Sequence, residues 1–243
     1  MIWEKGVAAF GESPEDLKGK RVQLPTYPQF LPLVTYGFYA EFRSRVIFNR
    51  TVWRDAEKVF NGLNKLNNCW TQTGCTVVYV HMRMGDYKYH LNALQWDCDV
   101  FEKTNYLQDA FKKVATLYKK PMFYIVGYSD KDVDNFFHTH KEEFSPYHYK
   151  LVAPYEREML PHRRTKSYQD FDLEGIDLAL LAMSEVLILS YGSYGDFGAL
   201  LGRDKKHVLY PGKHKAHDET GVNLGLPHFL PIPWNITETE RTK

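Results

Sequence analysis

The strongest constraint on the fold is an alternation that begins after Cys75, where short β-branched or aromatic runs are separated by longer amphipathic segments. This alternation is typical of a parallel sheet covered by helices. The expected strands are residues 76–80, 123–126, 150–152, 186–189 and 208–210, and the expected helices between them are 106–118, 131–138, 173–183 and 197–201. We therefore predict an α/β, Rossmann-like fold. Nucleotides bind at the carboxyl edge of such sheets, so polar residues directly after strands are site candidates.

The part of the chain before Cys75 has a different character. Residues 24–33 are rich in proline and read as a loop, whereas residues 36–48 and 55–66 place apolar side chains at helical spacing. A chain of 243 residues with 44% hydrophobic residues suits one large α/β domain, or one domain with a smaller lobe. The first twenty and last fifteen residues are polar, and we expect them to be loosely ordered.

The charge balance excludes a general attraction to nucleic acid, because 31 Lys and Arg face 30 Asp and Glu. Any phosphate binding must therefore be local. No apolar run approaches the roughly 20 residues that a membrane span needs, and no signal peptide is visible. We expect either a protein without a membrane anchor or a chain that lacks its natural beginning.

Three cysteines are too few for a disulfide-dense scaffold, and no His or Cys spacing matches a metal site. Cys69 and Cys75 either close a small loop in an oxidising compartment or remain unpaired thiols. Two sequons, at residues 49–51 and 235–237, would be glycosylated if the chain enters the secretory pathway.

The first cluster of chemical interest directly follows the expected strand 76–80 and reads His-Met-Arg-Met-Gly-Asp-Tyr, with His81, Arg83, Gly85 and Asp86 as its polar and glycine positions. This string resembles the His-x-Arg-Arg-Gly-Asp-Tyr signature of the α1,2-fucosyltransferases, glycosyltransferase family 11, which α1,6-fucosyltransferases share in modified form. Where the family has a second arginine, this chain has Met84. Without the resemblance, a salt-bridged turn is the alternative interpretation.

The resemblance implies that Arg83 grips the diphosphate of GDP-fucose. A guanidinium can donate to two phosphate oxygens at once and neutralise charge as GDP departs. Gly85 would let the backbone turn beneath the ligand, His81 would lie near the nucleotide, and Asp86 would orient its neighbours or approach the sugar.

The second cluster, residues 175–202, reads as helix, strand, tight turn and helix. Ser193 stands where the last helix would begin, with Asp196 three residues later in a capping-box-like arrangement. The free N–H groups at such a helix start, together with a serine hydroxyl, can bind a phosphate. An ordinary helix cap is the alternative.

This segment also resembles the fucosyltransferase family. The aspartate associated there with the guanine base falls on Asp177, and the turn that touches phosphate falls on Gly192, Ser193 and Tyr194. One carboxylate can accept two hydrogen bonds from the N1–H and 2-amino edge of guanine. A partner of a helix N-terminal dipole is the alternative role for Asp177. Ser129, after the expected strand 123–126, is a further possible contact, or simply a helix cap.

The resemblance implies the donor-binding half of a two-Rossmann, GT-B-like glycosyltransferase with a truncated N-terminal lobe. Residues 1–70 would be a partial acceptor-side helical segment, 71–213 the GDP-fucose-binding domain and 214–243 a tail. The implied reaction moves L-fucose from GDP-β-L-fucose to galactose O2 of a glycan with inversion, without a metal cofactor. Asp86 and His90 are the candidate general bases by their nearness to the motif.

The resemblance also implies a Golgi location, with membrane association only through a segment outside this chain. The protein's partners would be GDP-fucose and a galactose-containing glycan. Nucleic acid is not expected as a partner. Two rival hypotheses remain: a catalytically impaired domain that binds GDP or glycan or assists another enzyme, and an enzyme that fucosylates a protein hydroxyl or the glycan core.

Overall fold

The computed structural model describes residues 48–66, 69, 75–82, 84, 105–127, 130–152, 170–190, 193–201, 205–211 and 229–232. Six strands form one open sheet in the order β3-β2-β1-β4-β5-β6. All five neighbouring pairs are parallel. The strands are β1 (Thr76–Met82), β2 (Pro121–Gly127), β3 (His148–Leu151), β4 (Val186–Ile188), β5 (His207–Pro211) and β6 (Phe229–Ile232).

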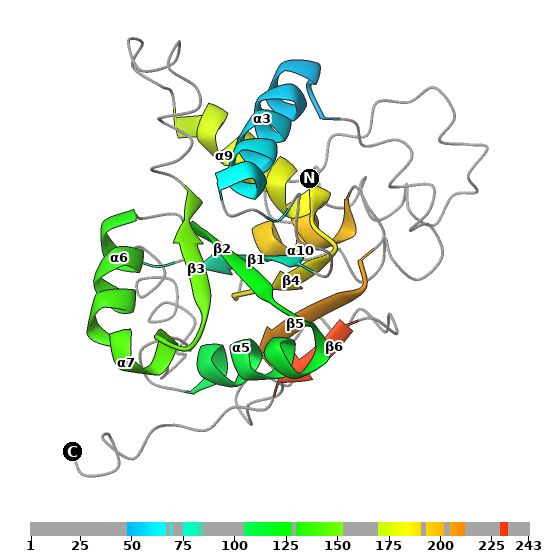
Figure 1. Ribbon diagram of the computed structural model, residues 1–243. Helices are drawn as coiled ribbons and strands as arrows, with labels where there is room; N and C mark the ends of the chain where they lie inside the picture. The colour runs from blue at the N-terminus through cyan, green and yellow to red at the C-terminus, as the bar shows by residue number, and fades with distance from the viewer. Residues whose placement is uncertain are drawn as a thin grey trace, which may run out of the picture.

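Helices cover both faces of this sheet (Figure 1). One face carries α5 (Tyr106–Leu117), α6 (Asp130–Thr139) and α7 (Lys141–Phe144), and the other carries α3 (Arg50–Leu66), α9 (Asp170–Met183) and α10 (Ser193–Leu200). The protein therefore has an α/β, Rossmann-like fold, as the alternating pattern predicts. All five expected strands and the helices between them are confirmed, with ends that differ by a few residues.

The side-chain alternation of β1 explains how one strand supplies two cores. Val78, Val80 and Met82 face the aromatic-rich side with α5, α6 and α7. Tyr79 packs on the opposite side, among residues of α3, α9 and α10. Because successive side chains of a strand point to opposite faces, a strand buried on both sides must be apolar almost throughout.

The first core is organised around Phe111 of α5. Its ring stacks on Phe123 of β2 with centroids 3.9 Å apart, and it meets Phe144 at 5.0 Å and Tyr147 at 5.3 Å nearly edge to face. Such aromatic contacts add to the free energy gained by burying the rings themselves. They fix α5 and α7 against β2.

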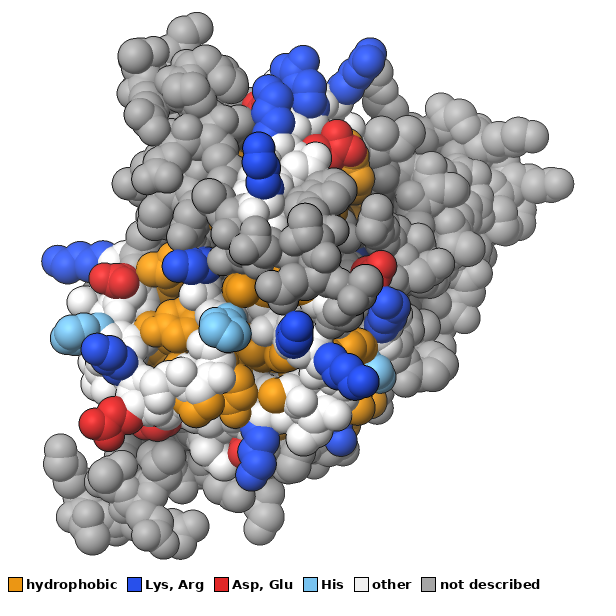
Figure 2. All heavy atoms as spheres, in the orientation of Figure 1, with side chains coloured by type: hydrophobic (Ala, Val, Ile, Leu, Met, Phe, Trp, Pro, Cys, Tyr) orange, Lys and Arg blue, Asp and Glu red, His pale blue; other side chains and the backbone are white. Residues whose placement is uncertain are grey.

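Helix α3 belongs to the second core, although the sequence placed residues 1–70 in a separate acceptor-side segment. Its Ala56, Val59 and Leu63 are fully buried beside the sheet. The hydroxyl of Tyr124 on β2 donates a hydrogen bond to Asn64 Oδ1 at 3.2 Å. Basic side chains gather over the outer side of α3 in Figure 2, where Arg50, Arg54, Lys58 and Lys65 are exposed.

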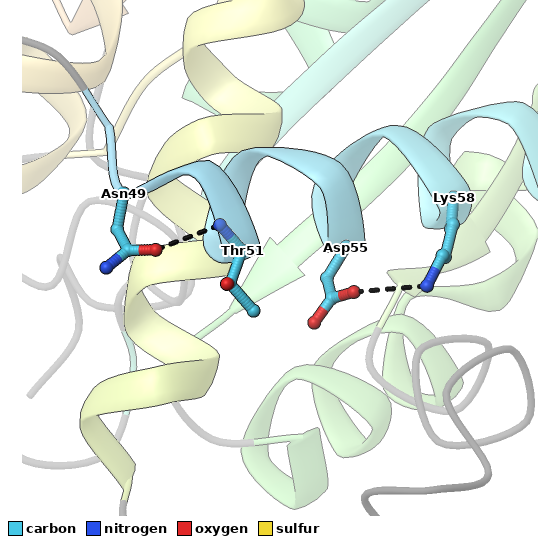
Figure 3. A network of polar contacts seen from close by, with 4 residues as sticks. All are labelled: Asn49, Thr51, Asp55 and Lys58. Carbon is cyan, nitrogen blue, oxygen red and sulfur yellow. Dashed lines mark hydrogen bonds and ion pairs between the residues drawn. The ribbon is translucent and has the colours of Figure 1, made fainter.

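Helix α3 begins earlier than residue 55, where the apolar spacing starts. Asn49 caps it, because its Oδ1 accepts a hydrogen bond from the Thr51 amide at 2.9 Å (Figure 3). The rings of Phe48 and Trp53 lie 5.4 Å apart, in the positions of a hydrophobic staple. The segment 36–48, also expected to be helical, lies outside the described residues except for Phe48.

Cys69 and Cys75 form a disulfide in the turn between α3 and β1, with a Cα separation of 5.4 Å. Of the two alternatives left open by the spacing, the structure has the closed loop. Its position between a helix and the central strand ties α3 to the start of β1.

The sixth strand lies in the part of the sequence that we expected to be a C-terminal tail. β6 pairs in parallel with β5 through Val208–Phe229 and Leu209–Leu230. Its Phe-Leu-Pro-Ile run contains a proline, which argues against a central strand but is tolerated at a sheet edge. Among the described helices, none is long and apolar enough to cross a membrane.

Candidate functional site

The strand order places a topological switch point between β1 and β4. From β1 the chain continues to β2 and β3 on one side, whereas β4, β5 and β6 extend to the other side. The order 3-2-1-4-5-6 is that of dinucleotide-binding Rossmann folds, in which ligands bind in the crevice outside the carboxyl ends of the strands at this point. Of the two clusters singled out in the sequence, the described residues His81, at the end of β1, and Ser190, just after β4, lie at this point.

His81 is the described residue at the centre of this switch point. It is the next-to-last residue of β1 and is 4% exposed. Ser190, two residues after β4, contacts it twice: the Ser190 amide donates to the His81 carbonyl at 3.0 Å, and Ser190 Oγ lies 3.1 Å from His81 Nδ1. The hydroxyl and the strand ladder together fix the orientation of the imidazole ring.

The first turn of α10 closes over the same histidine. The Tyr194 ring lies 5.4 Å from the imidazole, centroid to centroid, at an angle of 31°. A Cβ added to Gly195 would lie only 2.7 Å from His81 Nδ1. Position 195 is therefore glycine because the helix backbone approaches the histidine ring more closely than any side chain permits.

Ser193 is the first residue of α10, and nothing is described of its side chain. The helix follows β4 directly, so its N-terminal end faces the carboxyl edge of the sheet where His81 lies. The positive end of the helix dipole makes that edge attractive to an anion. The sequence prediction of a helix beginning at Ser193 is confirmed.

Asp177 lies in the middle of α9, eighth of its fourteen residues, with a half-buried side chain. The helix dipole acts mainly on the first turn, so the alternative role as a partner of the N-terminal dipole does not fit this position. Helices α9 and α10 touch at Leu181 and Gly198, where a Cβ on the glycine would lie 2.7 Å from Leu181 Cβ. α9 precedes β4 and α10 follows it. One helical turn before this contact, Asp177 lies on α9 and Tyr194 lies on α10.

Met84, the departure from the fucosyltransferase signature, is a core residue. Its side chain is 4% exposed and belongs to the aromatic-rich core with Met82 and Tyr106. A thioether fills this apolar space without needing a polar partner, whereas an arginine in the same place would have to bury its charge. The substitution therefore fits its surroundings in this chain.

Several of the predicted site residues lie outside the part of the chain that the structure describes. They are Arg83, Gly85, Asp86, His90, Ser129 and Gly192. Arg83 is nevertheless bonded to Met82, the last residue of β1, and to Met84. Among the described residues, no group of three or more His, Cys, Asp and Glu is placed to hold a metal ion.

Two residues of this region were missed in the sequence. Ser190 directly follows an expected strand, so the rule that polar residues after strands are candidates would have found it. The Tyr106 hydroxyl donates to the Leu189 carbonyl at 2.7 Å and approaches the Leu209 carbonyl at 3.3 Å, which links the end of β4 to the middle of β5. No local pattern marks Tyr106, because its partners are 83 and 103 positions away.

No model of a known protein family matches the chain, and a search of curated proteins likewise gives no match.

Proposed function

We propose that this protein is a fucosyltransferase that binds GDP-β-L-fucose at the switch point and transfers L-fucose to galactose O2 of a glycan with inversion. In this proposal the described domain is the donor-binding half of a GT-B-like enzyme. The observation that carries it is the meeting of the two motif segments: His81, the first residue of the first motif, and Ser190, within the second, are in hydrogen-bond contact, 109 positions apart in the sequence.

The diphosphate is assigned to two positive elements. Arg83 directly follows Met82, the last residue of β1, in the sequence. The start of α10, with Ser193, faces the same edge from β4. A guanidinium and a helix N-terminus can share the charge of a diphosphate, and both interactions strengthen as the leaving group gains charge.

The guanine base is assigned to Asp177. Its carboxylate is half-buried, so water competes less for it than for a surface carboxylate. It could accept hydrogen bonds from both N1–H and the 2-amino group, which adenine does not offer as a pair. His81, fixed by Ser190 and Gly195, would contact the edge of the nucleotide, with Gly85, Gly192, Tyr194 and Ser129 as further contacts.

The transfer is a single displacement at the anomeric carbon. The acceptor O2 attacks C1 from the face opposite GDP, the bond between C1 and the β-phosphate oxygen breaks, and an α linkage results. The hydroxyl proton passes to a general base, for which Asp86 and His90 are the candidates. Stabilising the departing GDP through Arg83 and α10 lowers the barrier even where the base is weak.

A second candidate function is binding of GDP or a glycan without transfer. Burial of Met84 in the core favours it, because the family's second arginine would supply positive charge that this chain does not place there. A protein that binds GDP without transfer would share the donor site with the transferase and differ from it only in turnover.

Calorimetric titration of GDP tests the donor site. We expect a dissociation constant on the order of micromolar, with ADP much weaker. Arg83→Ala should weaken GDP by about tenfold to a hundredfold, whereas Lys112→Ala, which removes an exposed cation on α5, should not. Failure of the folded protein to bind GDP would contradict fucosyl transfer and would leave only glycan binding from the second candidate.

Base recognition is tested with IDP, which lacks the 2-amino group of guanine. Asp177→Ala should weaken GDP more than IDP, so that the preference for GDP shrinks. Glu142→Ala, an exposed carboxylate on α7, serves as the matched control. An unchanged GDP-to-IDP ratio in Asp177→Ala would remove Asp177 from the guanine site.

Turnover separates the two candidates. GDP-fucose is incubated with a galactose-terminated disaccharide, and the product is analysed by mass and by NMR of its linkage. An α1,2-linked fucoside made by the wild type and lost in Arg83→Ala supports transfer. GDP binding without a product would favour the second candidate.

A further inference from the structure

The sequon Asn49-Arg50-Thr51 lies at the start of α3, and all three of its residues are exposed. Asn49 holds one defined conformation there: its Oδ1 accepts the Thr51 amide at 2.9 Å, and its carbonyl accepts the Trp53 amide at 2.9 Å. The packing of Phe48 on Trp53 fixes the chain on both sides of the asparagine.

The cap uses only the oxygen of the Asn49 amide. Figure 3 shows Nδ2 directed away from the helix, opposite to the bond with Thr51. N-glycosylation joins Nδ2 to C1 of a sugar, while the bond from C1 to the diphosphate of a lipid-linked oligosaccharide breaks and Nδ2 loses one proton. The oxygen is unchanged by this reaction, so the glycosylated asparagine can still cap α3.

The disulfide is an independent observation about the compartment. Cys69 and Cys75 are bonded just after α3. Disulfides of this structural kind form and persist in oxidising compartments such as the lumen of the endoplasmic reticulum, where N-glycans are also added.

We propose that Asn49 carries an N-linked glycan, which projects into solvent from the first turn of α3. The proposal does not depend on fucosyl transfer, because it rests on the sequon, its exposure and the disulfide. The second sequon, Asn235-Ile236-Thr237, lies outside the described residues.

The test uses the full chain, directed into the secretory pathway of a eukaryotic cell by an added signal peptide, with Asn235→Gln to leave one sequon. Total cell extract is treated with peptide N-glycosidase and examined by gel mobility and mass. Total extract is used because glycan addition precedes folding. A glycan on a poorly folding variant is therefore still detected.

Two substitutions of Thr51 separate the sequon from the cap. Thr51→Ser keeps the sequon and Thr51→Ala abolishes it, while both keep the backbone amide that Asn49 accepts from. We expect one removable glycan on the parent and on Thr51→Ser, and none on Thr51→Ala. A parent chain without a removable glycan, or one that Thr51→Ala retains, would overturn the proposal.

Discussion

Ser190 and His81 are joined by two hydrogen bonds across the boundary between β4 and β1, one through the Ser190 amide at 3.0 Å and one through its hydroxyl at 3.1 Å. The backbone bond extends the sheet, whereas the hydroxyl bond sets the imidazole orientation. A single side-chain atom, Ser190 Oγ, therefore links the segment after β4 to the imidazole at the end of β1.

Ser190→Ala should therefore lower both stability and nucleotide affinity. Loss of a buried hydrogen bond costs about 1–2 kcal/mol of unfolding free energy. Ser184→Ala is the matched control, because Ser184 is also buried and flanks the other end of β4, where its hydroxyl donates to the Leu181 carbonyl at 2.8 Å. Both variants should lower the free energy of unfolding measured in urea, whereas only Ser190→Ala should weaken GDP binding measured by calorimetry.

A methyl group at position 195 should displace the imidazole of His81. The added Cβ would lie 2.7 Å from Nδ1 and 3.3 Å from Leu189 Cδ2. We expect Gly195→Ala to destabilise the protein by about 1–3 kcal/mol and to weaken GDP binding. Gly198→Ala should cost a similar amount through Leu181 while leaving GDP affinity nearly unchanged. Equal effects of both variants on GDP affinity would contradict the assigned role of His81.

Two adjacent lysines should differ sharply in their contributions to stability. Lys205 is 6% exposed, and its Nζ donates to the Ala182 carbonyl at 2.7 Å and approaches the Leu201 carbonyl at 3.4 Å, so it links the ends of α9 and α10. We expect Lys205→Met to lower the unfolding free energy by about 2 kcal/mol. Lys206 forms an exposed ion pair with Glu185. Lys206→Met should therefore change the unfolding free energy by less than about 0.5 kcal/mol. Thermal or urea unfolding compares the two.

Stability should fall as the pH drops below about 6.5, the usual pKa of histidine. Burial, and then the charge of Lys113, lowers the pKa of His207, whose Nδ1 is hydrogen-bonded to the Tyr118 hydroxyl. As the pH falls, the unfolded chain takes up a proton on His207 before the folded protein does. The stability that comes from neutral His207 is therefore present above the unfolded pKa and is lost as the pH falls through the folded pKa.

The control for this dependence is His207→Gln. Urea midpoints measured from about pH 8 to about pH 5 should decline less steeply in His207→Gln than in the wild type. An identical slope in both proteins would show that other groups carry the pH dependence.

The sequence by itself determined five of the six described strands, the longer helices between them and the order of the motifs. Strands such as β1 and β4 are recognisable because continuous apolar runs are a local property of buried parallel strands. The start of α10 at Ser193 was also predictable, because the residue types that favour a helix start act locally. What a local pattern could not reveal is that α3 packs into the same core, or that a proline-containing run forms β6.

Only the tertiary structure decided which elements are neighbours. β4 lies beside β1 and not beside β3 because of packing over the whole sheet. No local pattern in either strand predicts this pairing. The contact of His81 with Ser190 and the crowding of Gly195 against the imidazole are consequences of that adjacency. Interactions between residues over a hundred positions apart depend on the complete fold, because chain connectivity brings such groups together only after the sheet has formed.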